Sequence, residues 1–117
     1  MPEVNLKSID TSTKFLGKTL SAPLLITGMT GGTDKGGAIN QKLAKAAEKA
    51  KVALGLGSQR PMLKDSSAAR HYKGRHLCPS VPLIGNIGAV NLVEYPIDKI
   101  EWLVSSGRVD LADWKRK

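Results

Sequence analysis

The fold of this chain is decided by residues 23–56, which read PLLITGMTGGTDKGGAINQKLAKAAEKAKVALGL. An apolar run opens this stretch at residues 23–29, and a glycine-rich turn separates it from a helical stretch at about residues 36–51. The apolar residues of the helical stretch recur at helical spacing and form one stripe: Ile39, Leu43, Ala46, Ala47 and Ala50. A second apolar run follows at residues 52–56. The order strand, helix, strand predicts one parallel βαβ unit.

The same alternation continues along the chain. A weaker helical candidate lies at residues 66–77, a third apolar run lies at residues 81–86, and a second clear helix begins near Pro96 and is expected to stop at Gly107. With a fourth run at residues 108–112, the strand starts fall at intervals of 29, 29 and 27 residues. Each interval holds one strand and one crossover helix, and near-continuous apolar strands predict a parallel sheet covered on both faces.

Two architectures fit this spacing, an open doubly wound sheet and part of a (β/α)8 barrel. A whole barrel needs roughly 250 residues, so a chain of 117 residues would form a small complete sheet or close to half a barrel. Ahead of the first unit, the residue types alternate over residues 11–15, and Gly17 stands where a hairpin would turn. We therefore expect a short β-hairpin before the main sheet.

Composition narrows the class of protein. The length of 117 residues allows one domain, and a chain with 41% hydrophobic and 24% charged residues has ordinary globular composition. No apolar run approaches the ~18 residues of a membrane span, and the first residues do not resemble a secretory signal. The single cysteine, Cys78, excludes an intrachain disulfide and a four-thiol zinc site. We therefore expect a soluble, cytoplasmic chain with no membrane partner.

The net charge of +8, from 18 basic and 10 acidic residues, suits nucleic acid, an anionic membrane surface or a phosphorylated substrate. Proteins that bind single-stranded nucleic acid also need aromatic side chains on which bases stack. Only five aromatic residues occur here, and they are scattered: Phe15, Tyr72, Tyr95, Trp102 and Trp114. This pattern favours lysines on solvated helix faces and no nucleic-acid partner. A small basic nucleic-acid-binding module is the alternative from another class.

The candidate site lies where the apolar runs end, because parallel α/β folds bind ligands at the carboxyl ends of their strands. The first run ends in TGMTGG at residues 27–32, the second in GSQR at residues 57–60, and the third in GNIG at residues 85–88. Glycines at these positions let the backbone approach a planar or phosphorylated ligand closely. Glycines at strand ends also form tight turns without any ligand, and this structural explanation stays open for each terminus.

The polar side chains of these three termini suit such a ligand. Thr30, Ser58 and Asn86 can donate and accept hydrogen bonds at the edge of a heterocycle. Arg60 offers a planar guanidinium group that matches a phosphate. Residues 55–60 match the dinucleotide-binding fingerprint at two glycines only, because Arg60 occupies the position of the third glycine. A Rossmann assignment is therefore rejected.

Six short segments share a pattern that goes beyond their positions at strand ends: residues 10–13, 15–18, 22–26, 28–32, 57–60 and 82–89. Together they resemble the type 2 isopentenyl-diphosphate isomerases, over residues 3 to about 106. The combination of Met-Thr-Gly-Gly at residues 29–32 with Gly-Ser-Gln-Arg at residues 57–60 is specific at this separation. Either tetrapeptide alone would be a weak signal.

The resemblance implies an FMN-dependent (β/α)8 barrel that interconverts isopentenyl diphosphate and dimethylallyl diphosphate in isoprenoid biosynthesis. Family members use reduced FMN, with NADPH as the usual reductant and Mg2+ to bind the diphosphate, and full-length members form homo-oligomers. The residues implied to line the flavin are Thr27, Gly28, Met29, Thr30, Ser58 and Asn86. Those implied to meet the substrate diphosphate are Ser58, Gln59 and Arg60. No catalytic residue and no metal ligand is assigned in this chain.

The resemblance also divides the chain. Residues 1–22 would form an N-terminal extension with the hairpin, and residues 23–117 a partial (β/α)8 barrel with units 1–3 and the start of strand 4. The family's magnesium-binding glutamate and flavin-phosphate loops are expected outside this sequence, and residues 107–117 depart from the family pattern. An altered reading frame or a truncation near Ser106 would produce this departure. We expect the chain alone to be inactive and to associate. Another FMN barrel, an oxidoreductase acting on a different anion, is the alternative among enzymes.

Overall fold

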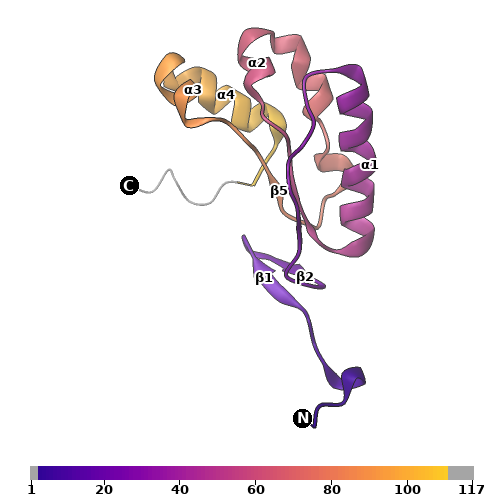
Figure 1. Cartoon of the computed structure of the whole chain (residues 1–117). Coiled ribbons are helices and arrows are strands. Elements are labelled where there is room, and N and C mark those ends of the chain that lie inside the picture. Colours follow the sequence, from indigo (N-terminus) through magenta and orange to yellow (C-terminus); the bar gives the residue numbers. More distant parts are fainter. Residues whose placement is uncertain (1–2, 111–117) are drawn as a thin grey trace.

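The structure, a computed structural model, describes residues 3–110 (Figure 1). With η denoting a 3-10 helix, its elements in chain order are η1 (Leu6–Ser8), β1 (Thr13–Phe15), β2 (Lys18–Leu20), β3 (Leu25–Ile26), α1 (Asp34–Ala50), β4 (Ala53–Gly55), α2 (Arg60–Lys64), η2 (Ser66–Tyr72), η3 (Arg75–Leu77), β5 (Leu83–Ile84), α3 (Ala89–Glu94) and α4 (Ile97–Gly107). Figure 1 shows α1 on one side of β5 and the pair α3 and α4 on the other.

The central sheet is parallel and has the order β3-β4-β5. Leu25 pairs with Ala53, and Leu54 pairs with Leu83. The middle strand is the most enclosed, since Ala53 and Leu54 have almost no exposed surface. Parallel neighbours need a crossover, which α1 provides between β3 and β4, and which α2, η2 and η3 provide between β4 and β5. The structure thus confirms the α/β class with a parallel sheet.

The predicted hairpin is formed by β1 and β2, which are antiparallel with Thr13 opposite Leu20. Leu16 and Gly17 make its two-residue turn, with φ values of 48° and 75°. Positive φ at both central residues matches the right-handed twist of the two strands, as in a type I′ turn. The hairpin is therefore confirmed, and Figure 1 shows it beyond the end of the central sheet.

The first long helix, α1, starts two residues before its predicted start because Thr33 caps it. The Thr33 hydroxyl accepts a hydrogen bond from the Gly36 N–H at 3.0 Å. The buried face also differs from the predicted stripe, with Ile39 43% exposed; its buried residues are Gly36, Gly37, Asn40, Ala44 and Ala47. Small residues on this face let η2 approach closely, because a Cβ on Gly37 would lie 2.9 Å from His71 Nδ1.

The connection from β4 to β5 is less regular than the predicted helix over residues 66–77. It contains the short helix α2 and then two 3-10 helices, η2 and η3. Asp65 separates α2 from η2 with an extended φ of −140°, and its carboxylate accepts a hydrogen bond from the Ser67 N–H at 2.9 Å. The helices α2 and α3 were not predicted, because five or six residues are too few to show a helical period.

The second clear helix is confirmed as α4, but Gly107 belongs to its last turn and does not stop it. Arg108 closes the helix in the left-handed conformation, with φ of 47°. Gly107 is needed for packing, because a Cβ there would lie 3.0 Å from Gln59 Nε2. The prediction placed the end of the helix one residue early because it assigned the closing conformation to the glycine.

The fourth apolar run starts alongside β5, where the Asp110 N–H donates a hydrogen bond to the Leu83 carbonyl oxygen at 2.7 Å. Residues 111–112 of the predicted strand lie outside the described residues. Within residues 3–110, none of the helices combines the length and the apolar character needed to cross a membrane.

Candidate functional site

The carboxyl ends of β3, β4 and β5 meet at one edge of the sheet and line an open cavity of about 420 Å³. Its lining includes Thr27 and Gly28 after β3, Gly55 at the end of β4, and Gly85 and Asn86 after β5. Parallel strands that end at the same edge bring these residues together although they are far apart in sequence. Three of them, Thr27, Gly28 and Asn86, are residues that the sequence analysis placed on a flavin.

Several glycines of this edge are required by contacts between loops. A Cβ on Gly28 would lie 2.0 Å from the Leu56 carbonyl oxygen, and a Cβ on Gly57 would lie 2.2 Å from the Thr30 carbonyl oxygen. These neighbours are backbone atoms, which cannot move aside as a flexible side chain can. The loop after β3 therefore rests directly on the loop after β4. At Gly28 and Gly57 this supports the structural explanation.

Gln59 joins the loops after β4 and β5. Its side chain has no exposed surface, and its Oε1 accepts a hydrogen bond from the Asn86 N–H at 3.1 Å. The Gln59 N–H donates in return to the Asn86 carbonyl oxygen at 2.8 Å, while Nε2 donates to Met62 Sδ at 3.5 Å. The Gln59 amide thus binds protein atoms here, and its contact with a diphosphate stays a prediction.

Thr30 is held by Asn40 of α1, a residue that the sequence analysis did not single out. The Thr30 hydroxyl donates to Asn40 Oδ1 at 2.8 Å, and Asn40 Nδ2 donates to the His71 carbonyl oxygen at 3.1 Å. Asn40 is only 6% exposed, so its amide binds the loop after β3 to η2 inside the protein. The sequence did contain a signal for this role, because Asn40 is a polar residue among the small residues of α1.

Tyr72 of η2 supports the loop after β4. Its hydroxyl donates to the Ser58 carbonyl oxygen at 2.7 Å, and a Cβ on Gly31 would lie 2.2 Å from that hydroxyl oxygen. Burial raises the pKa of the Tyr72 phenol, which keeps the group a protonated donor. Tyr72 therefore contacts both loops, while the Ser58 side chain remains exposed at the surface. The sequence analysis noted Tyr72 only as a scattered aromatic residue.

Arg60 and Met29 lie away from the shared cavity. Arg60 borders a second open cavity of about 320 Å³ together with Gly32, Lys64 and Asp65. Among the described residues its guanidinium group makes no hydrogen bond and no ion pair. Met29 is 74% exposed, which leaves most of an apolar side chain in water. The structure therefore separates the implied diphosphate contact Arg60 from the cavity lined by Thr27 and Asn86.

The described part of the chain offers no metal centre: residues 3–110 contain no group of three or more His, Cys, Asp or Glu side chains that could hold a metal ion. The fold and the site thus define a parallel βα repeat with a cavity at the carboxyl ends of three strands, lined by glycines, apolar residues and the polar side chains of Thr27 and Asn86. Such an edge is where α/β proteins bind planar or phosphorylated ligands.

Comparison with known proteins finds similar sequences that share one name. The chain is 49% identical over 92 residues to the isopentenyl-diphosphate delta-isomerase of Rickettsia africae (strain ESF-5), covering 79% of this chain and 27% of that protein. The protein of the same name from Rickettsia rickettsii (strain Sheila Smith) is 50% identical over 92 residues, with the same coverage. That of Rickettsia felis (strain ATCC VR-1525 / URRWXCal2) is 46% identical over 111 residues, covering 94% of this chain and 32% of that protein.

The chain therefore spans about a third or less of the length of these curated relatives. No family model matches the chain.

Proposed function

We propose that this chain supplies the first strand ends of an FMN-dependent, type 2 isopentenyl-diphosphate delta-isomerase. This enzyme would interconvert isopentenyl diphosphate and dimethylallyl diphosphate in isoprenoid biosynthesis. The observation that carries the proposal is the identity of 46–50% to proteins named isopentenyl-diphosphate delta-isomerase, over 79–94% of this chain. FMN dependence rests on the sequence resemblance, together with the geometry of the strand-end cavity.

The proposed architecture is a (β/α)8 barrel, to which residues 25–110 contribute consecutive βα units. Three consecutive parallel strands in the order β3-β4-β5 support this arrangement, because neighbouring barrel strands follow one another in sequence. The sheet is open at β3, which pairs only with β4 among the described residues. Further strands of a longer protein would pair there, and such a protein would form the homo-oligomer that the resemblance implies.

The cavity at the strand ends suits a flavin ring. A planar ring bound here would contact the backbone of Gly28, Gly55 and Gly85, which line the cavity. Thr27 and Asn86 offer hydrogen-bonding groups at the edge of such a ring. Met29, which the resemblance also assigns to the flavin, is 74% exposed and does not line this cavity. When bound, reduced FMN, with NADPH as its reductant, supplies the acid and base chemistry at the allylic carbon.

The substrate diphosphate would bind at the separate cavity of Arg60. Arg60 and Lys64 stand one helical turn apart on α2, and both border that cavity. A planar guanidinium matches two phosphate oxygens, and a lysine ammonium adds a second positive charge. The exposed hydroxyl of Ser58 belongs to the loop that leads from β4 to Arg60. We assign no residue of this chain to Mg2+, since residues 3–110 provide no ligand cluster.

Flavin binding by the purified 117-residue chain tests the proposal. We expect FMN to bind saturably, with quenching of its fluorescence, and Asn86→Ala to weaken binding by roughly two- to tenfold through loss of one hydrogen bond. The two hydrogen bonds that the Asn86 backbone makes to Gln59 remain in this variant, so its fold should persist. Gln41→Ala, on the exposed face of α1, is the matched control. Riboflavin distinguishes ring binding from phosphate binding.

Two results would count against the proposal. One is a chain with normal helical circular dichroism that shows no saturable quenching of FMN. The other is an Asn86→Ala variant that binds FMN as tightly as the Gln41→Ala control.

A further inference from the structure

A second cavity lies apart from the strand ends, between η2, η3 and α4, and has a volume of about 710 Å³. This volume is in the range of cavities that hold small ligands. It shares no lining residue with the cavity of Thr27 and Asn86 or with that of Arg60. The side chains that matter for its chemistry are Lys73, Arg75, His76, Trp102, Ser105 and Arg108.

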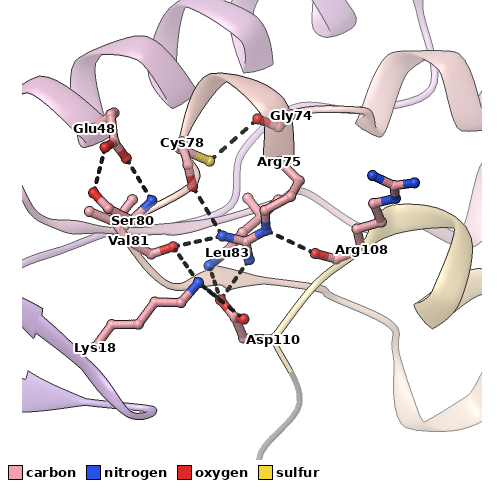
Figure 2. Close-up of polar contacts among 10 residues, drawn as sticks. All are labelled: Lys18, Glu48, Gly74, Arg75, Cys78, Ser80, Val81, Leu83, Arg108 and Asp110. Atoms are coloured by element: carbon pink, nitrogen blue, oxygen red, sulfur yellow. Dashed lines mark hydrogen bonds and ion pairs between the residues drawn. The ribbon is translucent and has the colours of Figure 1, made fainter.

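Among residues 3–110, the lining of this cavity is basic and includes no carboxylate. Lys73 and Arg108 are exposed, and among the described residues neither side chain makes an ion pair or a hydrogen bond. Figure 2 shows the Arg108 guanidinium extending away from the carboxylate of Asp110. Two cationic groups without partners at one cavity favour an anion, and His76 adds a further ring nitrogen at the same wall.

Arg75 is a fixed part of this wall. Its guanidinium donates to the carbonyl oxygens of Cys78, Val81 and Arg108 at 3.0, 2.8 and 3.1 Å and to Asp110 at 2.6 Å (Figure 2). Asp110 also binds Lys18 at 3.1 Å, so one carboxylate faces two cations. The cluster therefore keeps a net positive charge, which adds to the field of Lys73 and Arg108 at the cavity.

Trp102 of α4 gives the cavity an aromatic wall. Its side chain is 38% exposed although it is the largest apolar side chain of the helix. Ser66 and Ser106 line the cavity with hydroxyl groups that can donate to phosphate oxygens, while the Ser105 hydroxyl donates to the Trp102 carbonyl oxygen at 3.0 Å. An exposed indole beside unpaired cations matches a ligand with an aromatic ring and a charged phosphate, because a nucleotide base stacks on such a ring.

We infer that this cavity binds a small phosphorylated aromatic compound of the nucleotide class, with its ring on Trp102 and its phosphates at Lys73 and Arg108. This site is additional to the proposed flavin and diphosphate site. Its ligand is a free mononucleotide, because the five aromatic residues of the chain are too scattered for a strand of successive bases.

Calorimetric titration of the full 117-residue chain with ADP tests this inference. We expect saturable binding with one site, and we expect adenosine and inorganic pyrophosphate each to bind at least about tenfold more weakly, because each keeps only one half of the contacts. Lys73→Glu and Arg108→Asn should each weaken ADP binding by roughly threefold or more. Asparagine is chosen at residue 108 because it tolerates the left-handed backbone. Trp102→Leu should cost roughly tenfold through lost stacking.

The controls separate this site from general charge attraction and from the strand-end site. Lys45→Glu makes the same charge change on the exposed face of α1, outside the cavity, and should leave ADP affinity within about twofold. Arg60→Ala removes the proposed diphosphate contact and should leave ADP binding intact, whether or not FMN binds.

Three outcomes would overturn the inference. The first is the absence of saturable ADP binding by a chain with normal helical circular dichroism. The second is an equal loss of affinity in Lys45→Glu and Lys73→Glu. The third is tighter binding of a single-stranded oligonucleotide than of ADP with a steep salt dependence, which would identify a nucleic-acid surface. If Trp102→Leu fails to fold, the two exposed charge variants still decide the question.

Discussion

At the residue scale, the strand-end loops are held by side chains that do not face the cavity. The Gln59 side chain accepts a hydrogen bond from the Asn86 N–H, and the Tyr72 hydroxyl donates to the backbone carbonyl of Ser58. Asn40 does the same for Thr30. Hydrogen bonds between buried side chains and backbone fix loop positions, because each broken bond would leave a polar group unsatisfied. The positions of Ser58, Thr30 and Asn86 thus depend on this inner set of amides and a phenol.

Tyr72→Phe tests this support at one atom. The variant removes the hydroxyl bond to the Ser58 carbonyl oxygen and keeps the buried ring, so we expect the free energy of unfolding to fall by about 1 kcal/mol. The melting temperature should fall by roughly 4 °C, measured by thermal circular dichroism.

Tyr95→Phe is the control, since the Tyr95 hydroxyl makes no hydrogen bond among the described residues and its ring still faces Lys99. Equal stability changes in the two variants would show that the bond to Ser58 does not support the loop.

At the element scale, one carboxylate connects three separate elements at the amino end of the sheet. Asp110, after α4, accepts hydrogen bonds from Lys18 of β2, from Arg75 of η3 and from the N–H of Leu83 in β5 (Figure 2). The side chain of Asp110 is 26% exposed, so its interactions are only partly screened by water. One ionic centre therefore joins the hairpin, the second crossover and the start of β5.

This centre predicts a pH dependence of stability. Burial raises the pKa of the Asp110 carboxyl, but hydrogen bonds from Leu83, Arg75 and Lys18 outweigh burial and hold the pKa below its ordinary value of 3.8. A group with a lowered folded pKa stabilises the fold above its unfolded pKa and loses that effect as pH falls through the folded value. Asp110→Asn should therefore lower the free energy of unfolding by about 2 kcal/mol at pH 6. The deficit should shrink toward pH 3.

Urea unfolding at the two pH values measures this difference. Asp98→Asn, in the exposed first turn of α4, controls for the removal of one carboxylate. A deficit for Asp110→Asn that is as large at pH 3 as at pH 6 would contradict the ionic explanation.

At the scale of the whole molecule, the edge of the central sheet at β3 exposes unpaired backbone groups and apolar side chains. β3 pairs only with β4 among the described residues, and Leu24 and Leu25 are 62% and 45% exposed along it. Phe15 of the hairpin, 40% exposed, extends this apolar surface around an open cavity of about 240 Å³. Unpaired strand edges with apolar side chains pair readily with other chains.

We therefore expect the purified 117-residue chain to self-associate, as measured by sedimentation velocity over a range of concentrations. Leu25→Lys should shift the chain toward monomer, because a charge on an edge strand opposes pairing. Leu92→Lys, at a position 53% exposed on α3, is the matched control. A chain that is monomeric at every concentration would contradict the expectation, and so would equal effects of the two lysines.

The elements show where prediction from sequence succeeds and where it stops. The apolar runs and the turn at Gly17 were sufficient to predict the three parallel strands and the hairpin, because these features are local. The buried face of α1 was predicted only in part: Ala47 is buried as expected, but Gly37 faces η2 and the larger Ile39 is exposed to water. Close packing of two helices favours small side chains, and a search for large apolar residues misses that face.

The sequence by itself determined the α/β class, the order of the three parallel strands with the helices α1 and α4, and the position of the candidate residues at strand ends, because these depend on local periodicity and turn residues. Only the tertiary structure decided which residues share a cavity. It places Asn86 with Thr27, turns Gln59 inward and sets Arg60 at a separate cavity. The physical reason is that the direction of a loop side chain depends on hydrogen bonds and close contacts with loops that are distant in sequence.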